Sequence, residues 1–312
     1  MRFVTKCISG LLILGTAGLM SACSNDDDTV NNQVLDTPQY EDDAALYQIT
    51  STDSEYASIE LTASGNYIIL PSWMAYTRSV DRKSSFFFSN SNLTRAEYYG
   101  IIEGKYTKTG ENTYNLQGFG TLTVVEDGGS TVNLEILLNN GNEINLTAAV
   151  KNQYADSEMT NNLCRTWNIN DINIRIVIDG KTYLSHSFNK NNYKDYLDDY
   201  DEVMDFDDGF PEQVIFTKAG TYMVTYTNDA LAVSTWSWVN QNQGTLRYSW
   251  DYDDMDNDYM AGTVKVEFPG NNRLVITETY TEDYDYDYDY DDDDDFYGDV
   301  QYIMVYNLSE VK

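Results

Sequence analysis

Two hairpin sequences recur in the same order in the two halves of this chain. Residues 58–70, "SIELTASGNYIIL", and residues 213–225, "QVIFTKAGTYMVT", both read as a strand, then Thr-x-x-Gly-x-Tyr, then a second strand. The glycine of such a motif supplies the backbone conformation of a tight hairpin turn. Farther along each half, residues 131–148 and 263–278 again place two alternating strands around a Gly/Asn turn. The repeat predicts two related antiparallel β domains, one after the other.

The spacing of strands in the second half predicts its architecture. Proline is scarce, with 4 residues, whereas the chain has 27 tyrosines and many Thr, Val and Ile in short alternating runs, a composition that favours strands over helices. Such runs cover residues 163–178, 212–217, 221–227, 231–239, 245–250, 263–268, 273–281 and 300–308. Antiparallel strands in this order, joined mostly by short turns, predict an up-and-down barrel or a tightly curved sheet. The predicted fold class is all-β, with two consecutive antiparallel meander barrels, the second of about eight strands.

Three short motifs in the second half resemble a known family. They are "LCRTW" at residues 163–167, "VIFTKAGTY" at residues 214–222 and "STWSW" at residues 234–238. Together they resemble the lipocalin-like domains of bacterial surface lipoproteins. The resemblance implies a barrel in which a tryptophan of the first strand plugs one end, and Trp167 would be that residue. It covers residues 163–312 well and residues 44–150 loosely.

The N-terminus predicts export and lipid anchoring. Arg2 and Lys6 precede a short apolar stretch at residues 8–19, which is too short to span a bilayer core as a helix and reads as a signal peptide. The following "MSAC" resembles the lipobox of bacterial lipoproteins, in which the cysteine, here Cys23, carries acyl chains such as palmitate. A soluble secreted protein with a cysteine near the cleavage site is the alternative.

The residues after Cys23 predict a location. "SNDDD" at residues 24–28 resembles the acidic signal that sends some lipoproteins of Gram-negative bacteria to the outer face of the outer membrane. Acyl chains would anchor the protein there stably. Residues 25–43 contain few large apolar side chains, so they read as a flexible acidic tether.

These features divide the chain into five parts. The predicted parts are a signal peptide at 1–22, a tether at 23–43, a first β domain at 44–150, a polar linker at 151–162 and a second β domain at 163–312. The first domain has no counterpart of the "LCRTW" strand, so its sheet is expected to be incomplete. Once Cys7 leaves with the signal and Cys23 takes the lipid, Cys164 remains alone. The sequence therefore predicts neither a disulfide nor a zinc site.

The charge excludes one class of partner. The chain has 51 acidic and 19 basic residues, a net charge of −32. Phosphate binding needs clustered cations, so nucleic acid is not an expected partner. For the same reason the lipid, rather than surface charge, must hold the protein at a membrane.

The acidic residues of the second domain are confined to particular connections. In an up-and-down barrel the odd-numbered connections lie at one end, and here they contain residues 195–208, 251–258 and 282–299. Nearly half of the 51 acidic residues would therefore share one rim, facing away from the linker. The candidate cation-binding residues there are Asp251, Asp253, Asp254, Asp256, Asp285, Asp287 and Asp289.

The chemistry of this acidic rim stays open between two readings. Dense carboxylates supply the oxygen ligands that calcium takes, but no segment fits an EF-hand loop. One reading is weak binding of several Ca²⁺ ions; the other is a solvated set of acidic loops. Residues 284–290 place tyrosines on the core side of their strand, which could extend beyond the barrel as a tyrosine-faced ribbon. Because "DDDDD" offers no matching partner strand, disorder is expected there instead.

An aromatic insert in the first domain contains the candidate ligand-binding residues. Residues 71–100 contain several aromatic and cationic side chains, which could stack on sugar rings or apolar ligands. The candidates are Trp73, Tyr76, Phe87 and Tyr98. The alternative is that these aromatics cover a barrel end or the domain interface.

The sequence predicts binding rather than catalysis. There is one histidine, His186, in a segment that reads as a polar loop, and no catalytic motif appears. The expected function is a surface-exposed, non-enzymatic binding module for a glycan or a small apolar ligand. The alternative is a structural or adhesive surface protein whose acidic rim binds Ca²⁺ weakly or meets basic partners. No other cofactor is expected, and the oligomeric state stays open.

Overall fold

The first half of the chain closes into a barrel because its first strand pairs with its last. The structure, a computed structural model, describes residues 38–72, 100–126, 129–178, 180–196, 209–249, 261–270, 272–285 and 297–311. The first barrel consists of β1 (Ala45–Ile49), β2 (Tyr56–Leu61), β3 (Asn66–Pro71), β4 (Ile102–Gly110), β5 (Thr113–Leu116), β6 (Gly120–Glu126), β7 (Thr131–Leu138) and β8 (Glu143–Val150). Each strand pairs antiparallel with the next, and Tyr47 of β1 pairs with Val150 of β8.

The prediction that the sheet of the first domain is incomplete is therefore wrong. The short sequence "ALYQI" of β1 pairs with β2 on one side and β8 on the other, so it takes the place of the missing long strand. The last residues of the predicted tether are also ordered. Tyr40 lies against the ring of Tyr106, with 4.9 Å between ring centroids, and Lys108 binds Asp43 at 2.6 Å. These contacts make residues 38–44 part of the first barrel.

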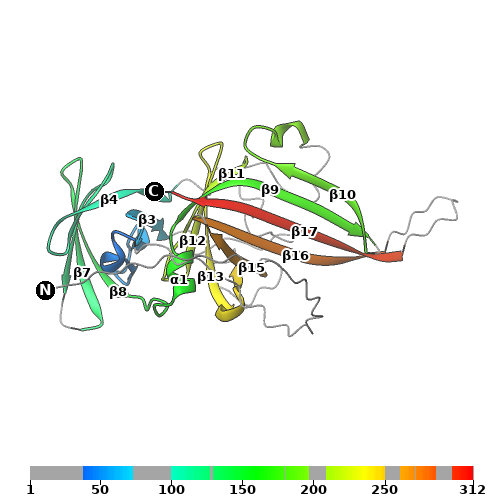
Figure 1. The fold of residues 1–312 in the computed structure, drawn as a ribbon. Coiled ribbons are helices and arrows are strands. Elements are labelled where there is room, and N and C mark those ends of the chain that lie inside the picture. The colour runs from blue at the N-terminus through cyan, green and yellow to red at the C-terminus, as the bar shows by residue number, and fades with distance from the viewer. Residues whose placement is uncertain are drawn as a thin grey trace, which may run out of the picture.

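The second half forms a longer barrel with one strand added (Figure 1). Its strands are β9 (Thr166–Ile178), β10 (Lys181–Phe188), β11 (Pro211–Phe216), β12 (Thr221–Tyr226), β13 (Leu231–Asn240), β14 (Thr245–Ser249), β15 (Ala261–Gly270), β16 (Arg273–Asp285) and β17 (Tyr297–Glu310). β9 pairs with β11 through its first residues and with β17 along its whole length, which closes the barrel. The prediction of two consecutive antiparallel barrels is confirmed.

Three details of the second barrel differ from the sequence-based expectation. β10, with the sequence "KTYLSHSF", lies in a segment predicted to be a connection, so His186 is in a strand rather than a polar loop. Its ring packs against Phe188, with 4.5 Å between centroids. The predicted linker contains α1 (Glu158–Leu163), which Ser157 caps by accepting a hydrogen bond from the backbone of Thr160. The first strand therefore begins at Thr166, not at residue 163.

The third difference is the length of the ribbon formed by β16 and β17. β15 pairs with β16 only as far as Glu278, but β16 and β17 stay paired up to Asp285 and Tyr297. The ribbon therefore runs past the shorter strands of the barrel (Figure 1). The rings of Tyr280 and Tyr302 stack at 4.8 Å along it. The disorder expected at residues 284–290 is therefore wrong for Tyr284 and Asp285, whose backbones are paired with β17.

The strand directions agree with the predicted sorting of the acidic connections. β14 and β16 end, and β11, β15 and β17 begin, at the same end of the barrel, because neighbouring strands of the sheet pair antiparallel. β10, which precedes the first acidic stretch, is added beside β9 and runs antiparallel to it. The most acidic stretches, residues 197–208, 250–260 and 286–296, lie outside the described residues. α1 lies at the opposite end, where Trp238 donates a hydrogen bond to Thr160 at 3.1 Å.

Large side chains fill the interior of the second barrel. The largest are almost completely buried: Trp167, Trp236, Tyr222, Tyr248, Tyr306, Phe188, Phe210 and Phe216. Burial of a large apolar side chain stabilises a fold by about 1.5–3 kcal/mol. Trp167 lies beside α1, where its indole N–H donates to the carbonyl of Leu163 at 3.0 Å. This is the position expected of a residue that closes a barrel end.

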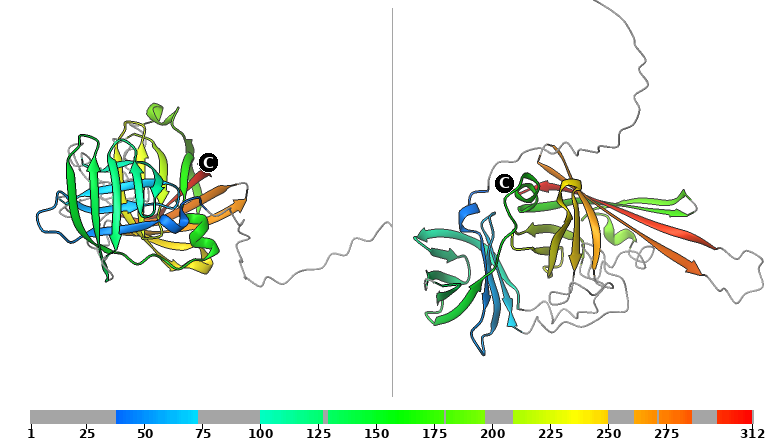
Figure 2. Two further views of the ribbon diagram at one scale, coloured as in Figure 1. Left: turned by 90° about the vertical axis from the view of Figure 1, so that its left-hand side faces the viewer. Right: turned by 90° about the horizontal axis from the view of Figure 1, so that it is seen from below.

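The two barrels pack wall to wall (Figure 2). Ile68, Leu70 and Ile101 of the first barrel form a buried cluster with three residues of the second, Ile215, Met223 and Val233. Side chains alternate between the two faces of a strand, so these residues lie on the outer walls, where solvent-facing positions are usually polar. The outer walls therefore share a small core of their own, which fixes the barrels side by side.

Replacement of Trp167 by alanine should destabilise the second barrel by about 3–5 kcal/mol, because it leaves a cavity under α1. Urea denaturation followed by tryptophan fluorescence measures the loss. Val239→Ala is the matched control, since Val239 is 59% exposed, and it should change the free energy of unfolding by less than about 0.5 kcal/mol. Equal effects of the two substitutions would contradict the assignment of Trp167 to the core.

Candidate functional site

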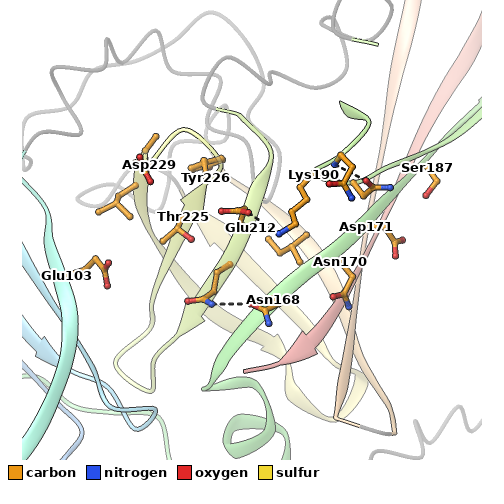
Figure 3. Close-up of a pocket in the computed structure, with 16 residues that line it drawn as sticks. Glu103, Asn168, Asn170, Asp171, Ser187, Lys190, Glu212, Thr225, Tyr226 and Asp229 are labelled. Carbon is orange, nitrogen blue, oxygen red and sulfur yellow. Dashed lines mark hydrogen bonds and ion pairs between the residues drawn. The ribbon is translucent and has the colours of Figure 1, made fainter. Parts of the chain in front are cut away.

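A polar groove lies on the outer wall of the second barrel, where it faces the first (Figure 3). Its volume is about 970 Å³, at the upper end of the range typical of ligand sites. The lining comes from both barrels: Glu103 from the first, and Asn168, Ile169, Asn170, Asp171, Ser187, Asn189, Lys190, Asn191, Glu212, Gln213, Thr225, Tyr226, Asp229, Ala230 and Leu231 from the second. Most of these side chains carry hydrogen-bonding groups.

A β-bulge explains why β9 presents so many polar groups to the groove. The register between β9 and β17 shifts where Asn307 pairs with Asp171 and Leu308 with Ile169, which leaves Asn170 as an extra residue. A bulge re-aims the side chains around it. Ile169 and Ile172 face the core, so the bulge allows Asn170 and Asp171, adjacent in sequence, both to face outward.

Hydrogen bonds hold the polar groups of β9 in place. Gln213 donates from Nε2 to Oδ1 of Asn168 at 3.1 Å, and Ser309 donates to Oδ1 of Asn170 at 3.1 Å. Asp171 accepts at Oδ1 from the amides of Asn173 and Asn307, at 2.8 and 2.7 Å. The carboxylate of Asp171 and the amides of Asn168 and Asn170 are therefore oriented in the absence of a ligand. Such preorganisation lowers the entropy cost of binding.

The groove has an excess of negative charge. Lys190 and Glu212 form an ion pair at 3.6 Å, which leaves Glu103, Asp171 and Asp229 without a cation among the lining residues. Burial raises the pKa of the Glu103 carboxyl above its ordinary value, and the neighbouring Lys105 partly opposes this. The positive charge of Lys105 thus offsets only part of the cost of burying the ionised carboxylate of Glu103.

Another carboxylate, that of Glu278, lies inside the second barrel, where tyrosine hydroxyls donate hydrogen bonds to it. Glu278 is 4% exposed and accepts hydrogen bonds from the hydroxyls of Tyr248 and Tyr306, the latter at 3.2 Å. Burial, followed by the charge of Glu278, raises the pKa of Tyr248 well above its ordinary value, so the phenol stays a donor. A buried carboxylate with two donors is a stable core feature.

The structure describes few of the residues that the sequence singled out. Cys23, the aromatic candidates Trp73, Tyr76, Phe87 and Tyr98, and the cation candidates Asp251, Asp253, Asp254, Asp256, Asp287 and Asp289 lie outside the described residues. Asp285 is the last residue of β16, opposite Tyr297. Those predictions remain predictions.

Cys164 is buried, and it caps α1 instead of lying in the strand predicted at residues 163–178. Burial raises the pKa of its thiol well above the ordinary value. The thiol therefore stays protonated and is a poor nucleophile.

The sequence reasoning missed the groove. Its signal was present in "NINDIN" at residues 168–173, where amides alternate with isoleucines and one extra polar residue breaks the alternation. A strand with isoleucine on the core side places such amides on the outside. That they face a groove depends on the position of the first barrel, which no local pattern reports.

Among the described residues, no group of three or more His, Cys, Asp or Glu side chains is placed to hold a metal ion. No helix in the described part of the chain is both long and apolar enough to cross a bilayer.

The sequence matches none of the models of known protein families, and no curated protein matches it significantly. The function must therefore be inferred from the residues of this chain.

Proposed function

We propose that this protein is a lipoprotein of the outer membrane, exposed at the cell surface, whose inter-barrel groove binds a glycan without catalysing a reaction. The observation that carries this proposal is the groove of about 970 Å³ lined by oriented amide and carboxylate groups.

The chemistry of the lining favours a polyhydroxyl ligand. Each sugar hydroxyl both donates and accepts hydrogen bonds, and the side-chain amides of Asn and Gln do the same in one plane. The groove offers such amides at Asn168, Asn170, Asn189, Asn191 and Gln213, with carboxylate acceptors beside them. A few fixed polar groups are what set the orientation of a ligand in a site.

The charge of the groove narrows the class of glycan. Three carboxylates that have no cationic partner among the lining residues, at Glu103, Asp171 and Asp229, repel uronates and sulfated sugars. Neutral sugars bind without this penalty, and amino sugars gain Coulomb attraction. The expected ligands are therefore neutral or amino-bearing glycans.

An apolar ligand in the second barrel is less well supported than a glycan in the groove. The barrel interior holds large buried side chains such as Trp167, Trp236 and Tyr222. An apolar ligand would have to displace packing at near-crystalline density. The groove, in contrast, is already open to a polar ligand.

The membrane attachment is supported by the sequence of residues 1–28 and by the place where the tether joins the fold. Glu41 forms an ion pair with Lys218 in the turn between β11 and β12. This turn lies at the end of the barrel opposite the strand ends that flank the acidic stretches. A lipid at Cys23 would therefore leave the acidic end facing away from the membrane.

Isothermal titration with oligosaccharides tests the binding function. The purified protein should bind neutral or glucosamine oligomers, and uronate oligomers at least about 10-fold more weakly. Asp171→Ala should weaken binding about 10-fold or more, because a hydrogen bond to a charged group contributes about 1.5–3 kcal/mol. Glu135→Gln is the matched control, since Glu135 is exposed on β7 outside the groove lining. Lack of binding to all three classes, or an equal loss with both variants, would refute the glycan site.

Replacement of Cys23 by serine tests the anchor. Without the thiol no acyl chain can attach, so the protein should move from the membrane fraction to the soluble fraction after cell lysis. Cys164→Ser serves as the control, because Cys164 is buried in the fold, and it should stay with the membrane. A Cys23→Ser protein that still sediments with outer membranes would contradict lipid anchoring at this residue.

A second function is favoured by the strand directions of the second barrel. The strand ends that flank the acidic stretches gather at one end, which supports an adhesive protein that binds Ca²⁺ weakly or meets basic partners there. In a thermal-shift assay, millimolar CaCl₂ should then raise the Tm by about 2–4 °C, the shift that about 1 kcal/mol causes in a chain of this size. NaCl of equal ionic strength is the control, and equal shifts with both salts would dismiss a calcium role.

A further inference from the structure

A single carboxylate is buried where the two barrels meet. Glu60 lies on the outer face of β2 and is 3% exposed. The hydroxyls of Thr217 and Thr221, in the β11–β12 hairpin of the second barrel, donate hydrogen bonds to it. Both threonines are buried as well. Glu60 therefore joins the first barrel to the second through two hydrogen bonds.

The charged groups around Glu60 are engaged elsewhere. Its cross-strand neighbours, Leu46 on β1 and Ile68 on β3, are apolar. From the second barrel, Arg165 forms an ion pair with Glu310 at 2.6 Å. In the adjacent hairpin, Lys218 pairs with Glu41 and Asp156.

The thiol of Cys164 also faces Glu60. The charge of Glu60 adds to the burial that raises the thiol pKa well above its ordinary value, so the thiol contributes no charge.

Burial makes the ionised form of Glu60 unfavourable in the docked state. Desolvation raises its pKa from 4.5 to about 7, and the hydrogen bonds from Thr217 and Thr221 only partly oppose this. If the barrels separate, Glu60 returns to water on the outer wall, where its pKa would be ordinary. Docking therefore binds a proton, and its stability is full below about 4.5 and is lost as the pH rises through about 7. The docking equilibrium should fall by up to about 300-fold across this window.

We propose that Glu60 is a proton-operated latch: its protonated form holds the two barrels together, and its ionisation loosens them. Loosening of the barrels would also open the groove. Glu103, the groove residue from the first barrel, lies on β4 two residues after Ile101, and Ile101 packs in the inter-barrel cluster. The groove is complete only when the barrels are docked. This regulatory role rests on the proposed function of the groove, whereas the latch itself does not.

Glu60→Gln tests the latch, because glutamine keeps the shape of the protonated side chain and cannot ionise. Urea denaturation of the purified protein and of the variant is compared at pH 5.5 and pH 8. Between pH 5.5 and pH 8 the folding equilibrium of the wild type should weaken, relative to that of Glu60→Gln, by about 30-fold, because part of the loss already occurs between pH 4.5 and pH 5.5. In small-angle X-ray scattering at pH 8, the wild type should have a larger maximum dimension than Glu60→Gln, and at pH 5.5 the two should agree.

Two further variants sharpen the test. Glu143→Gln removes an exposed carboxylate from β8 and should keep the wild-type pH dependence. Thr221→Val removes one donor that stabilises the charged form, so its pH dependence should be steeper than that of the wild type. Parallel pH dependence of the wild type and Glu60→Gln in denaturation, or identical scattering of the two at pH 8, overturns the latch.

Glycan titration separates failure of the latch from failure of the binding function. If the wild type binds a glycan but shows no difference from Glu60→Gln in denaturation and scattering, the latch is wrong and the groove function stands. If the pH-dependent opening is observed but no glycan class binds at pH 6, the latch stands and the binding function is wrong. If the latch and the glycan-binding function are both correct, the glycan affinity of the wild type should fall between pH 6 and pH 8 by more than that of Glu60→Gln.

Discussion

The contact between the outer walls of the two barrels is the constraint on which the site depends. A meander barrel usually presents polar side chains to water, yet β3, β11, β12 and β13 place isoleucine, leucine, methionine and valine on the outside. Burying these residues brings Glu103 opposite Asp171 and Asp229, and it creates the groove. The same contact removes Glu60 from water. One apolar interface thus produces both a polar site and a titratable group beside it.

The two barrels use their inner and outer surfaces differently. The second barrel is packed with aromatic side chains, and even its interior carboxylate, Glu278, is held by two tyrosine hydroxyls. The polar cavity lies instead on the outer wall, where the bulge at Asn170 turns adjacent polar residues toward the groove. A cavity on the convex outside of a barrel needs a second surface as its opposite side. Here the first barrel supplies that surface through Glu103.

Local sequence patterns predicted much of the fold because hairpins are local structures. The Thr-x-x-Gly-x-Tyr repeat located β2–β3 and β11–β12, and alternation located the other strands of the second barrel. β10 was missed because "KTYLSHSF" has only three core-facing residues, Leu184, His186 and Phe188, among polar ones. The closing role of β1 was missed because strand pairing between residues about 100 positions apart leaves no local pattern. The aromatic insert predicted to bind ligands lies outside the described residues, so its role stays a prediction.

The sequence by itself determined that this chain forms two successive meander barrels with acidic connections, because alternation and turn residues act over a few positions. It also determined the excess of acid over base, a property of composition alone. Only the tertiary structure decided that the amides of β9 face a groove and that Glu60 is buried. Both facts depend on where the outer wall of one barrel meets the other, and burial is a property of that contact rather than of the residue.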